Sequence, residues 1–433
     1  MGFLTTNTGS NVSDNIMEDI TMPAIVQFPT VVQEAVDHFG PMFRNEPERK
    51  HFAEYLTGLI VAHNKTVSGI NSEFANTTDQ SCLNRWLTEA QWDVEKLNEA
   101  RIEWLQRDAS TRFHHKGVIP IDNVLVDHSG KQIQDVGYFW DHAEQRYKIA
   151  QDYLIVNYVC PSEKHYPLEF RQFVKREQCE TKGIPFIDHN EMFRDLVEWV
   201  VNHAITGVFT FDSWFTHADN LNHINALKRD YVGDLKFNRK VIFCGKEMKV
   251  EEVAALIPAE DRKAVVIDGN QQWYFTKSVR ISDIDHPVRI VILWDRKNAI
   301  SARKIVITNR TNWEVNRIVG AYRGRWTGTE CFHRDGKQHL GMGDCQLRSG
   351  VGQTRHQYMV FLAYSVLMRQ MQGSRSSAWA LQRLTTIGEA CMAVMRQTFR
   401  QTIEWVVKQI MDEKQDFERI KLQLALYPNF AKV

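Results

Sequence analysis

The sequence lacks the features of a membrane, secreted or disulfide-rich protein. None of its apolar runs approaches the roughly 18 uninterrupted residues of a membrane-spanning helix. Its seven cysteines are an odd number without a Cys-x-x-Cys pair, which argues for reduced thiols and against a disulfide framework or a zinc finger. The N-terminus has no charged segment followed by an apolar run, as a secretion signal would require. We therefore expect a cytoplasmic protein without a membrane partner.

The chain also has no net charge, because 53 Lys and Arg balance 53 Asp and Glu. This balance is uneven along the sequence. Residues 296–337 contain ten Lys or Arg against three acidic residues, which gives this segment a local charge of about +7. A basic segment of this kind attracts the phosphates of a nucleic acid.

Hydrophobic periodicity predicts a mixed α+β or α/β fold. Helical spacing begins in "PERKHFAEYLTGLIVAHN", strand-like alternation begins in "GVIPIDNVLVD", and helices return after residue 313. The predicted segments are a disordered tail (1–22), a helical N-terminal DNA-binding domain (23–112), the first part of a catalytic core (113–232), a β-rich insertion (233–312), the second part of the core with the helix that carries Glu330 (313–375), and a C-terminal helical region (376–433).

Two short helices in the N-terminal domain are joined by the turn "NTTD", in which Asp79 is the expected N-cap. This arrangement is similar to a helix-turn-helix. Asn84 and Arg85, in the second helix, are therefore candidates for DNA contact. An ordinary helical bundle has the same pattern, so both interpretations stay open.

Two aspartates stand out because they belong to apolar strands. Asp122 lies inside the predicted strand "GVIPIDNVLVD", and Asp212 ends the buried strand "ITGVFTFD". A buried carboxylate needs a partner, since an unpaired buried charge is very costly. Asp122 either serves a metal or catalytic site or faces solvent at a sheet edge, and Asp212 could instead cap the following helix.

A third acid, Glu330, lies in the stretch "YRGRWTGTECFHRDGKQHLG" (322–341). Its basic and aromatic neighbours there are Tyr322, Arg323, Arg325, Trp326, Arg334 and Lys337. Three carboxylates on neighbouring elements can hold two Mg²⁺ ions, which prefer oxygen ligands. Two metals about 3.5–4 Å apart promote phosphodiester chemistry. On a helix, Glu330, Arg334 and Lys337 would lie on one face, so the acid could hold metal while the bases hold substrate phosphates.

These motifs, in this order, resemble the IS4-like DDE transposases and especially their IS701 group. The pattern "YRGRW…E……K" resembles the Tyr-Arg-Glu-Lys signature of that family, and "IDNVLVDHSGK" and "FDSWF" resemble the regions of its first and second acids. The helical opening, with "YLTGLI" and "LNRWLTEAQWD", is similar as well. The likeness extends from about residue 45 to 370 and includes a β-rich segment between the second and third acids.

The resemblance implies a ribonuclease-H-like catalytic core in which Asp122, Asp212 and Glu330 are the catalytic metal ligands. It implies two Mg²⁺ ions, with Mn²⁺ as a substitute, and phosphate contacts by Tyr322, Arg325 and Lys337. The expected partners are double-stranded DNA, as terminal inverted repeats and as target, and a second copy of the chain in the synaptic complex. The expected location is the nucleoid of a bacterial cell.

The chain departs from the family pattern in one spacing. The signature usually places its Glu four residues after its Arg, whereas Glu330 follows Arg325 by five. A local kink at Thr327, Gly328 and Thr329 would absorb the extra residue.

The sequence therefore predicts a cut-and-paste transposase that cleaves at terminal inverted repeats and transfers the 3′-hydroxyl into target DNA. Excision through a hairpin would need an unstacked base held by an aromatic side chain, with Trp294, Trp313 and Trp326 as candidates. One alternative is a catalytically silent regulator that binds the terminal repeats. Two others are a metal-dependent nuclease that does not transpose and a purely structural role for Glu330 as an ion-pair partner.

Overall fold

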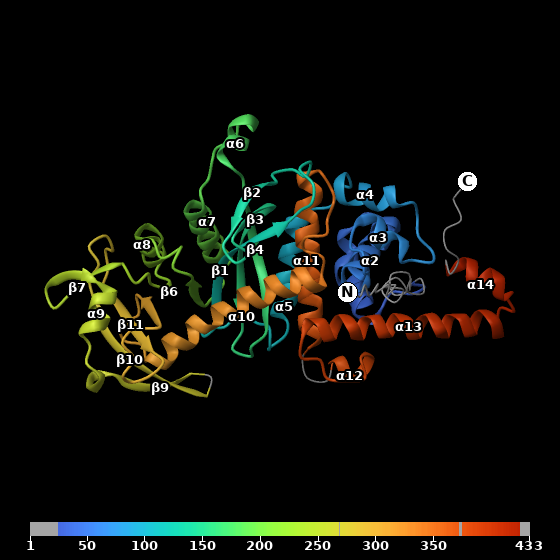
Figure 1. Cartoon of the computed structure of the whole chain (residues 1–433). Helices are drawn as coiled ribbons and strands as arrows, with labels where there is room; N and C mark the ends of the chain where they lie inside the picture. The colour runs from blue at the N-terminus through green and yellow to red at the C-terminus, as the bar shows by residue number, and fades with distance from the viewer. Residues whose placement is uncertain (1–24, 268, 372–374, 425–433) are drawn as a thin grey trace, which may run out of the picture.

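The computed structural model describes residues 25–267, 269–371 and 375–424 (Figure 1). The tail predicted over residues 1–22 lies outside these ranges. At the N-terminal end, Asp79 accepts a hydrogen bond from the backbone N–H of Ser81 at the start of a short helix, as expected for an N-cap. The N-terminal helices are α1 (Thr30–Phe39), α2 (Glu46–Val61), α3 (Val67–Ser72), α4 (Gln80–Thr88) and α5 (Val94–Gln106).

A mixed sheet of ten strands forms the centre of the molecule. Its order is β2-β3-β1-β5-β6-β12-β11-β10-β9, with β4 paired to β3. The pairs β1–β5 and β5–β6 are parallel, and the other pairs are antiparallel. The strands are β1 (Val118–Asp127), β2 (Gly137–Asp141), β3 (Arg146–Val159), β4 (His165–Phe173), β5 (Val208–Phe211), β6 (Asp230–Asp234), β9 (Lys263–Ile267), β10 (Asn270–Val279), β11 (Val288–Trp294) and β12 (Lys304–Thr308). This large mixed sheet is consistent with the expected ribonuclease-H-like fold.

The segment 233–312 adds strands to this same sheet. β12 pairs with β6, where Thr308 lies opposite Val232, and β11, β10 and β9 follow outward in that order. These strands are at the left of Figure 1, beyond β6. The segment also holds the separate hairpin of β7 (Lys240–Phe243) and β8 (Lys246–Lys249), followed by α9 (Val250–Leu256).

Two core strands, β6 and β4, have no counterpart among the strands predicted from the sequence, and β4 is the more unusual in composition. It contains Pro167, which lacks a backbone N–H and usually argues against a strand. The strand tolerates it because the β3–β4 ladder shifts register between Val156 and Asn157, and Pro167 lies opposite Asn157 at that irregularity.

Helices cover both faces of the central strands. On one face, Phe193 of α7 (His189–Asn202) packs edge-on against Phe211 of β5, with ring centroids 5.2 Å apart. On the other face, Ile318 of α10 (Val315–His339) joins a cluster with Val208 and Val232. Residues 208 and 211 point to opposite faces of β5 because side chains alternate along a strand. Two shorter helices, α6 (Arg176–Lys182) and α8 (Ala218–Ala226), flank α7 in the chain.

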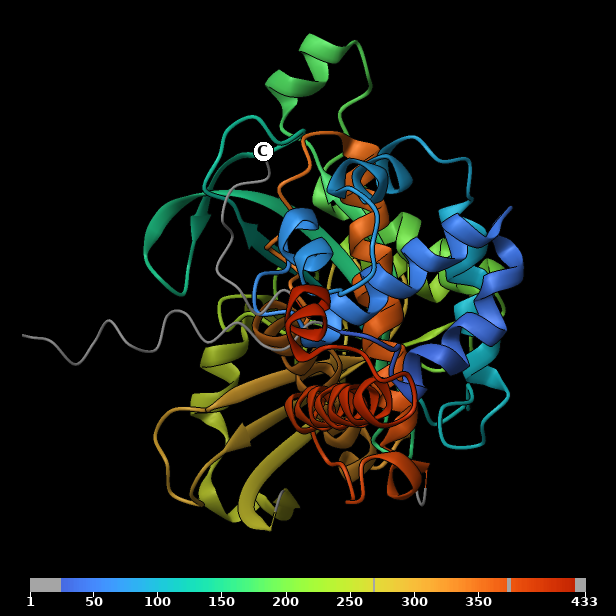
Figure 2. The same cartoon turned by 90° about the vertical axis from the view of Figure 1, so that its right-hand side faces the viewer.

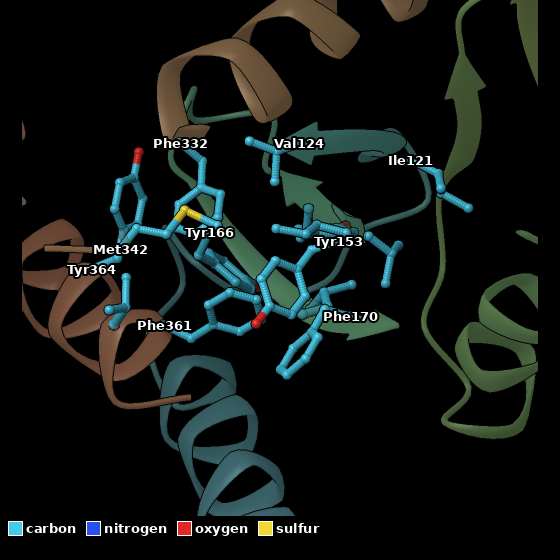
Figure 3. Packing of buried hydrophobic residues seen from close by; sticks show 14 of the residues in the cluster. Ile121, Val124, Tyr153, Tyr166, Phe170, Phe332, Met342, Phe361 and Tyr364 are labelled. Atoms are coloured by element: carbon cyan, nitrogen blue, oxygen red, sulfur yellow. The ribbon is translucent and has the colours of Figure 1, made fainter. Parts of the chain in front are cut away.

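The C-terminal helices connect the sheet to the N-terminal helices. Phe332 of α10 packs edge-to-face against Phe361 and Tyr364 of α11 (Gly350–Gln370), at 5.4 and 4.9 Å (Figure 3). In Figure 2, α13 (Ile387–Met411) lies beside the N-terminal helices, where Gln397 accepts a hydrogen bond from the backbone of Thr30. The remaining helices are α12 (Arg375–Trp379) and α14 (Phe417–Gln423).

Candidate active site

The first two predicted acids lie side by side on neighbouring parallel strands. In the β1–β5 ladder, Val118 pairs with Val208 and Pro120 with Thr210, a constant offset of 90 residues. The same offset relates Asp122 to Asp212, which directly follows the last residue of β5. Residues level on adjacent strands point to the same face of a sheet. Asp122 and Asp212 therefore share the face that α10 covers.

A fourth acid extends this row and was not among the residues predicted from the sequence. In the β5–β6 ladder, Phe211 pairs with Gly233, and the same offset relates Asp212 to Asp234, the last residue of β6. Burial raises the pKa of Asp234, Lys304 lowers it, and the nearby Asp212 raises it further. The available signal was an acid ending a short strand, "DYVGD", just as Asp212 ends "VFTFD".

Close packing of α10 on β1 brings the basic residues of the helix to these acids. A Cβ atom at Gly328 would lie 2.5 Å from Cγ of Pro120 and 2.8 Å from Val159, and one at Gly324 would lie 3.0 Å from Val118. Only glycine permits this approach. The helix is continuous from Val315 to His339 and includes residues 327–329, so the kink expected there stays a prediction. These glycines accommodate the sheet and do not break the helix.

Arg325 forms the direct link between α10 and the acids. Its guanidinium donates to Oδ2 of Asp122 at 2.7 Å, and both side chains are largely buried. The Nε of Arg325 is buried without a hydrogen-bond partner in the described part of the chain. Tyr322, one turn earlier, has two cations near its ring: the Cζ of Arg325 is 5.8 Å from the ring centroid and the Nζ of Lys304 is 5.5 Å from it.

The pKa of Asp122 is affected by both of the other predicted acids. Burial raises the pKa of Asp122 to about 7, and the charges of Asp212 and Glu330 raise it as well, while Arg325 opposes them. Asp212 and Glu330 are therefore near enough for their charges to act on Asp122. The site accumulates negative charge, which bound cations would relieve.

The other predicted DNA-binding residues of α10 lie at the surface of the helix, outside the row of acids. The side chains of Arg323 and Trp326 on α10 are exposed, and Arg334 pairs with its neighbour Asp335 at 2.9 Å. The side chain of Lys337 is exposed by surface area but partly desolvated by the protein around it, which lowers its pKa, while the charge of Asp127 at the far end of β1 raises that pKa. Lys337 therefore lies beyond the acids and away from Arg325.

Asn84 and Arg85 belong to a different part of the molecule. Both lie on α4, which packs against α2, α3 and α11, on the opposite side of α11 from the strands that carry the acids (Figure 1). Arg85 is exposed and contacts Ser81 and Cys82 of its own helix. The two predicted contact regions are thus separate surfaces.

The acids suit a divalent metal by their chemistry. Carboxylate oxygens are the ligands that Mg²⁺ and Mn²⁺ prefer, and a cation would offset the repulsion that Asp122 experiences from Asp212 and Glu330. In the arrangement described, Arg325 holds one oxygen of Asp122. No three His, Cys, Asp or Glu side chains within residues 25–267, 269–371 and 375–424 are close enough together to hold a metal ion.

Comparison with known families identifies the class of protein. A family model described as DDE superfamily endonuclease matches residues 38–255, half of the chain, and a model described as Transposase DDE domain matches residues 187–366. The chain belongs to the DDE superfamily of endonucleases, and its residues 187–366 are similar to a transposase DDE domain. No curated protein shows significant sequence similarity to the chain.

Membership in this family confirms the resemblance to DDE transposases at the level of the superfamily. Proteins of this family are DNA-acting nucleases and transposases that generally use divalent metal ions. The IS4-like or IS701-group assignment stays a prediction. No helix in the described ranges is long and apolar enough to cross a membrane.

Proposed function

We propose that the protein is the DNA transposase of an insertion sequence and that Asp122, Asp212 and Glu330 are its catalytic metal ligands. The observation that carries this proposal is the row of acids under α10. Asp122 and Asp212 are level on adjacent strands, and Glu330 acts electrostatically on Asp122. Its substrates would be the terminal inverted repeats of the element and a target duplex.

Two divalent ions at these acids would activate the attacking oxygen and stabilise the leaving oxygen of a phosphodiester. The residues of α10 would hold the strand that is cut. Arg325, which donates to Asp122, would hold a phosphate at the same place, with Tyr322 beside it. Cleavage would release a 3′-hydroxyl, which then attacks the target strand.

A hairpin route of excision would draw on Trp326. The side chain of Trp326 is 62% exposed on α10, whereas Trp294 and Trp313 are 0% and 8% exposed and belong to the core. Of the three candidates, Trp326 alone is accessible to an unstacked base.

The assignment to the IS4-like and IS701 transposases rests on the order and spacing of the motifs around the three acids. We extend it to a dimer in the synaptic complex, because cleavage and transfer of two element ends require two active sites. Lys337, Arg334 and Arg323 would contact phosphates along α10, and Asn84 and Arg85 on α4 would contact the terminal repeat at a distance from the cut.

The test is a cleavage assay with a labelled duplex that carries the flanked terminal repeat, in Mg²⁺ or EDTA. We expect Mg²⁺-dependent cutting at the edge of the element, loss of cutting in Glu330→Ala, and unchanged cutting in Glu404→Ala, an exposed acid of α13. Specific binding without cutting in either Mg²⁺ or Mn²⁺ would instead identify a silent terminal-repeat-binding regulator. Cutting that survives Glu330→Ala would mean that another residue is the third acid.

A further inference from the structure

The acid row ends at Asp234, which forms an ion pair with Lys304, and neither residue has a part in the proposed function. Lys304 of β12 donates to Oδ2 of Asp234 at 2.9 Å, and Asp234 is level with Asp212 on the neighbouring strand. The side chain of Asp234 is 18% exposed, whereas that of Lys304 is 36% exposed. The carboxylate is therefore the inner member of the pair, and the ammonium is the member that a ligand in solution can reach.

The pair is built like the Arg325–Asp122 pair at the other end of the row. Each joins one acid of a central strand to one cation, and both cations contact the same tyrosine. The Nζ of Lys304 lies 3.4 Å from the hydroxyl of Tyr322 and 5.5 Å from its ring centroid, and Arg325 lies over the same ring. The two cations of these pairs therefore share Tyr322 as a neighbour.

Charge and access decide what Lys304 can bind. A strand of DNA whose phosphate reaches Asp122 and Asp212 would lie close to the cations that are bonded to the acids of this row, and a compact ammonium is a suitable point contact for a phosphate oxygen. The carboxylate of Asp234 is engaged by Lys304. This hydrogen bond holds the flexible side chain of Lys304 beside Tyr322.

We propose that Lys304 is a DNA-phosphate-binding residue of the active site and that Asp234 is the positioning residue that holds it. The proposal rests on the proposed function, because it assumes that a DNA strand lies over Asp122 and Asp212. It adds a contact on the β6–β12 side of the acids, outside the basic residues of α10.

Binding measured without a catalytic metal separates this proposal from the cleavage reaction. The affinity of the full chain for the terminal-repeat duplex is measured in EDTA across a series of salt concentrations. Loss of one phosphate contact lowers the slope of log affinity against log salt by about 1. We expect this change in Lys304→Met, with affinity reduced several-fold, and we expect Lys304→Arg to retain the wild-type slope. Lys408→Met, on the exposed surface of α13, is the matched control.

Asp234→Asn should behave differently from Lys304→Met. It removes a negative charge near the DNA, so binding is at least as tight as in the wild type. The ammonium is no longer held, so the cleavage rate at saturating DNA falls several-fold, and Lys304→Met combined with Asp234→Asn should cleave no more slowly than Lys304→Met alone. Melting temperatures near the wild-type value establish that each variant is folded.

Two results would overturn the proposal while leaving the proposed function intact. One is an unchanged salt slope in a folded Lys304→Met variant of a protein that binds and cuts. The other is a double variant whose rate loss equals the product of the two single losses, which would make Asp234 an independent contributor. Failure of the wild-type chain to bind the duplex would count against the proposed function itself.

Discussion

At the scale of single residues, Asp122 has the environment that departs most from that of an ordinary carboxylate. It lies in the middle of β1, 9% exposed, with one cation bonded to it and two further acids acting on it. Burial and repulsion both favour its neutral form, which is why its pKa rises to about 7. A divalent ion bound at this carboxylate would replace the repulsion by attraction and would stabilise the ionised form.

This environment predicts that metal binding stabilises the fold. A ligand at 100 times its Kd stabilises the native state by about 2.7 kcal/mol, which corresponds to a rise of roughly a few degrees in Tm for a chain of this size. We expect Mn²⁺ to raise the Tm of the wild type in this way and to have no such effect on Asp122→Asn. Glu404→Gln on α13 should respond like the wild type. An equal rise in wild type and Asp122→Asn would place metal binding elsewhere.

At the scale of elements, the position of α10 depends on glycine. Gly324 and Gly328 are one turn apart and face Val118 and Pro120 of β1, so the helix axis lies close to the sheet. The same helix carries Tyr322, Arg325 and Glu330. Helix propensity, which disfavours glycine by about 1 kcal/mol relative to alanine, is outweighed here by packing.

Two alanine substitutions in α10 should therefore have opposite effects on the free energy of unfolding. Gly328→Ala introduces a Cβ 2.5 Å from Pro120, and we expect a loss of about 1–3 kcal/mol together with slower cleavage. No described atom lies within 4 Å of a Cβ at Gly320, so Gly320→Ala should gain about 0.5–1 kcal/mol. Urea unfolding of both variants measures these changes. Equal effects of the two substitutions would mean that α10 does not pack closely on β1.

Many of the helices and strands could be predicted from the periodicity of apolar residues alone. The helices between residues 47 and 110, the strand of Asp122 and the buried strand before Asp212 were all expected, because their apolar spacing is regular. The close packing of Gly328 on Pro120 was not expected, because glycine in a sequence does not reveal whether a neighbouring strand needs the space. β4 was missed because Pro167 is tolerated only through a bulge that depends on β3.

Contacts that depend on tertiary pairing could not be predicted from the sequence. The three acids could be nominated because two of them end or interrupt apolar strands and the third lies among bases. Asp234 and Lys304 belong to short strands 70 residues apart, and only the β6–β12 pairing brings them together. The position of Lys337 beside the far end of β1 likewise depends on the path of α10 across the sheet.

At the scale of the whole molecule, buried polar groups tie the N-terminal helices to the core. The guanidinium of Arg101 on α5 donates to the carbonyl of Leu168 in β4 and to Ser365 on α11. His356 of α11 bonds to the hydroxyl of Tyr55 on α2 at 2.8 Å and to the carbonyl of Gly341 at 2.9 Å. We therefore expect the helices and the sheet to unfold together.

His356 also makes the stability of this assembly depend on pH. Burial lowers the pKa of His356 from 6.5 to about 4, so between these values the unfolded chain binds the proton and the folded chain does not. Stability is then complete above pH 6.5 and decreases as the pH falls toward 4, by up to about 3 kcal/mol.

The measurement compares the unfolding free energy at pH 7 and pH 5 in wild type and His356→Gln. The decrease on acidification should be about 2 kcal/mol smaller in the variant. His142→Gln, at an exposed histidine, should show the wild-type decrease. A variant that loses as much stability as the wild type would show that His356 does not titrate in this range.

The central claim is that Asp122 and Asp212 are metal ligands. Replacement of their carboxylate oxygens by the softer sulfur of cysteine tests it most directly. Mg²⁺ binds thiolate sulfur poorly, whereas Mn²⁺ accepts it better. Cleavage of the terminal-repeat duplex by Asp122→Cys and Asp212→Cys is measured in Mg²⁺ and in Mn²⁺, with the serine variants as controls. We predict no cutting in Mg²⁺, recovery in Mn²⁺ for the cysteine variants, and no recovery for the serine variants. Cutting by the cysteine variants in Mg²⁺, or no difference between cysteine and serine in Mn²⁺, would contradict the claim.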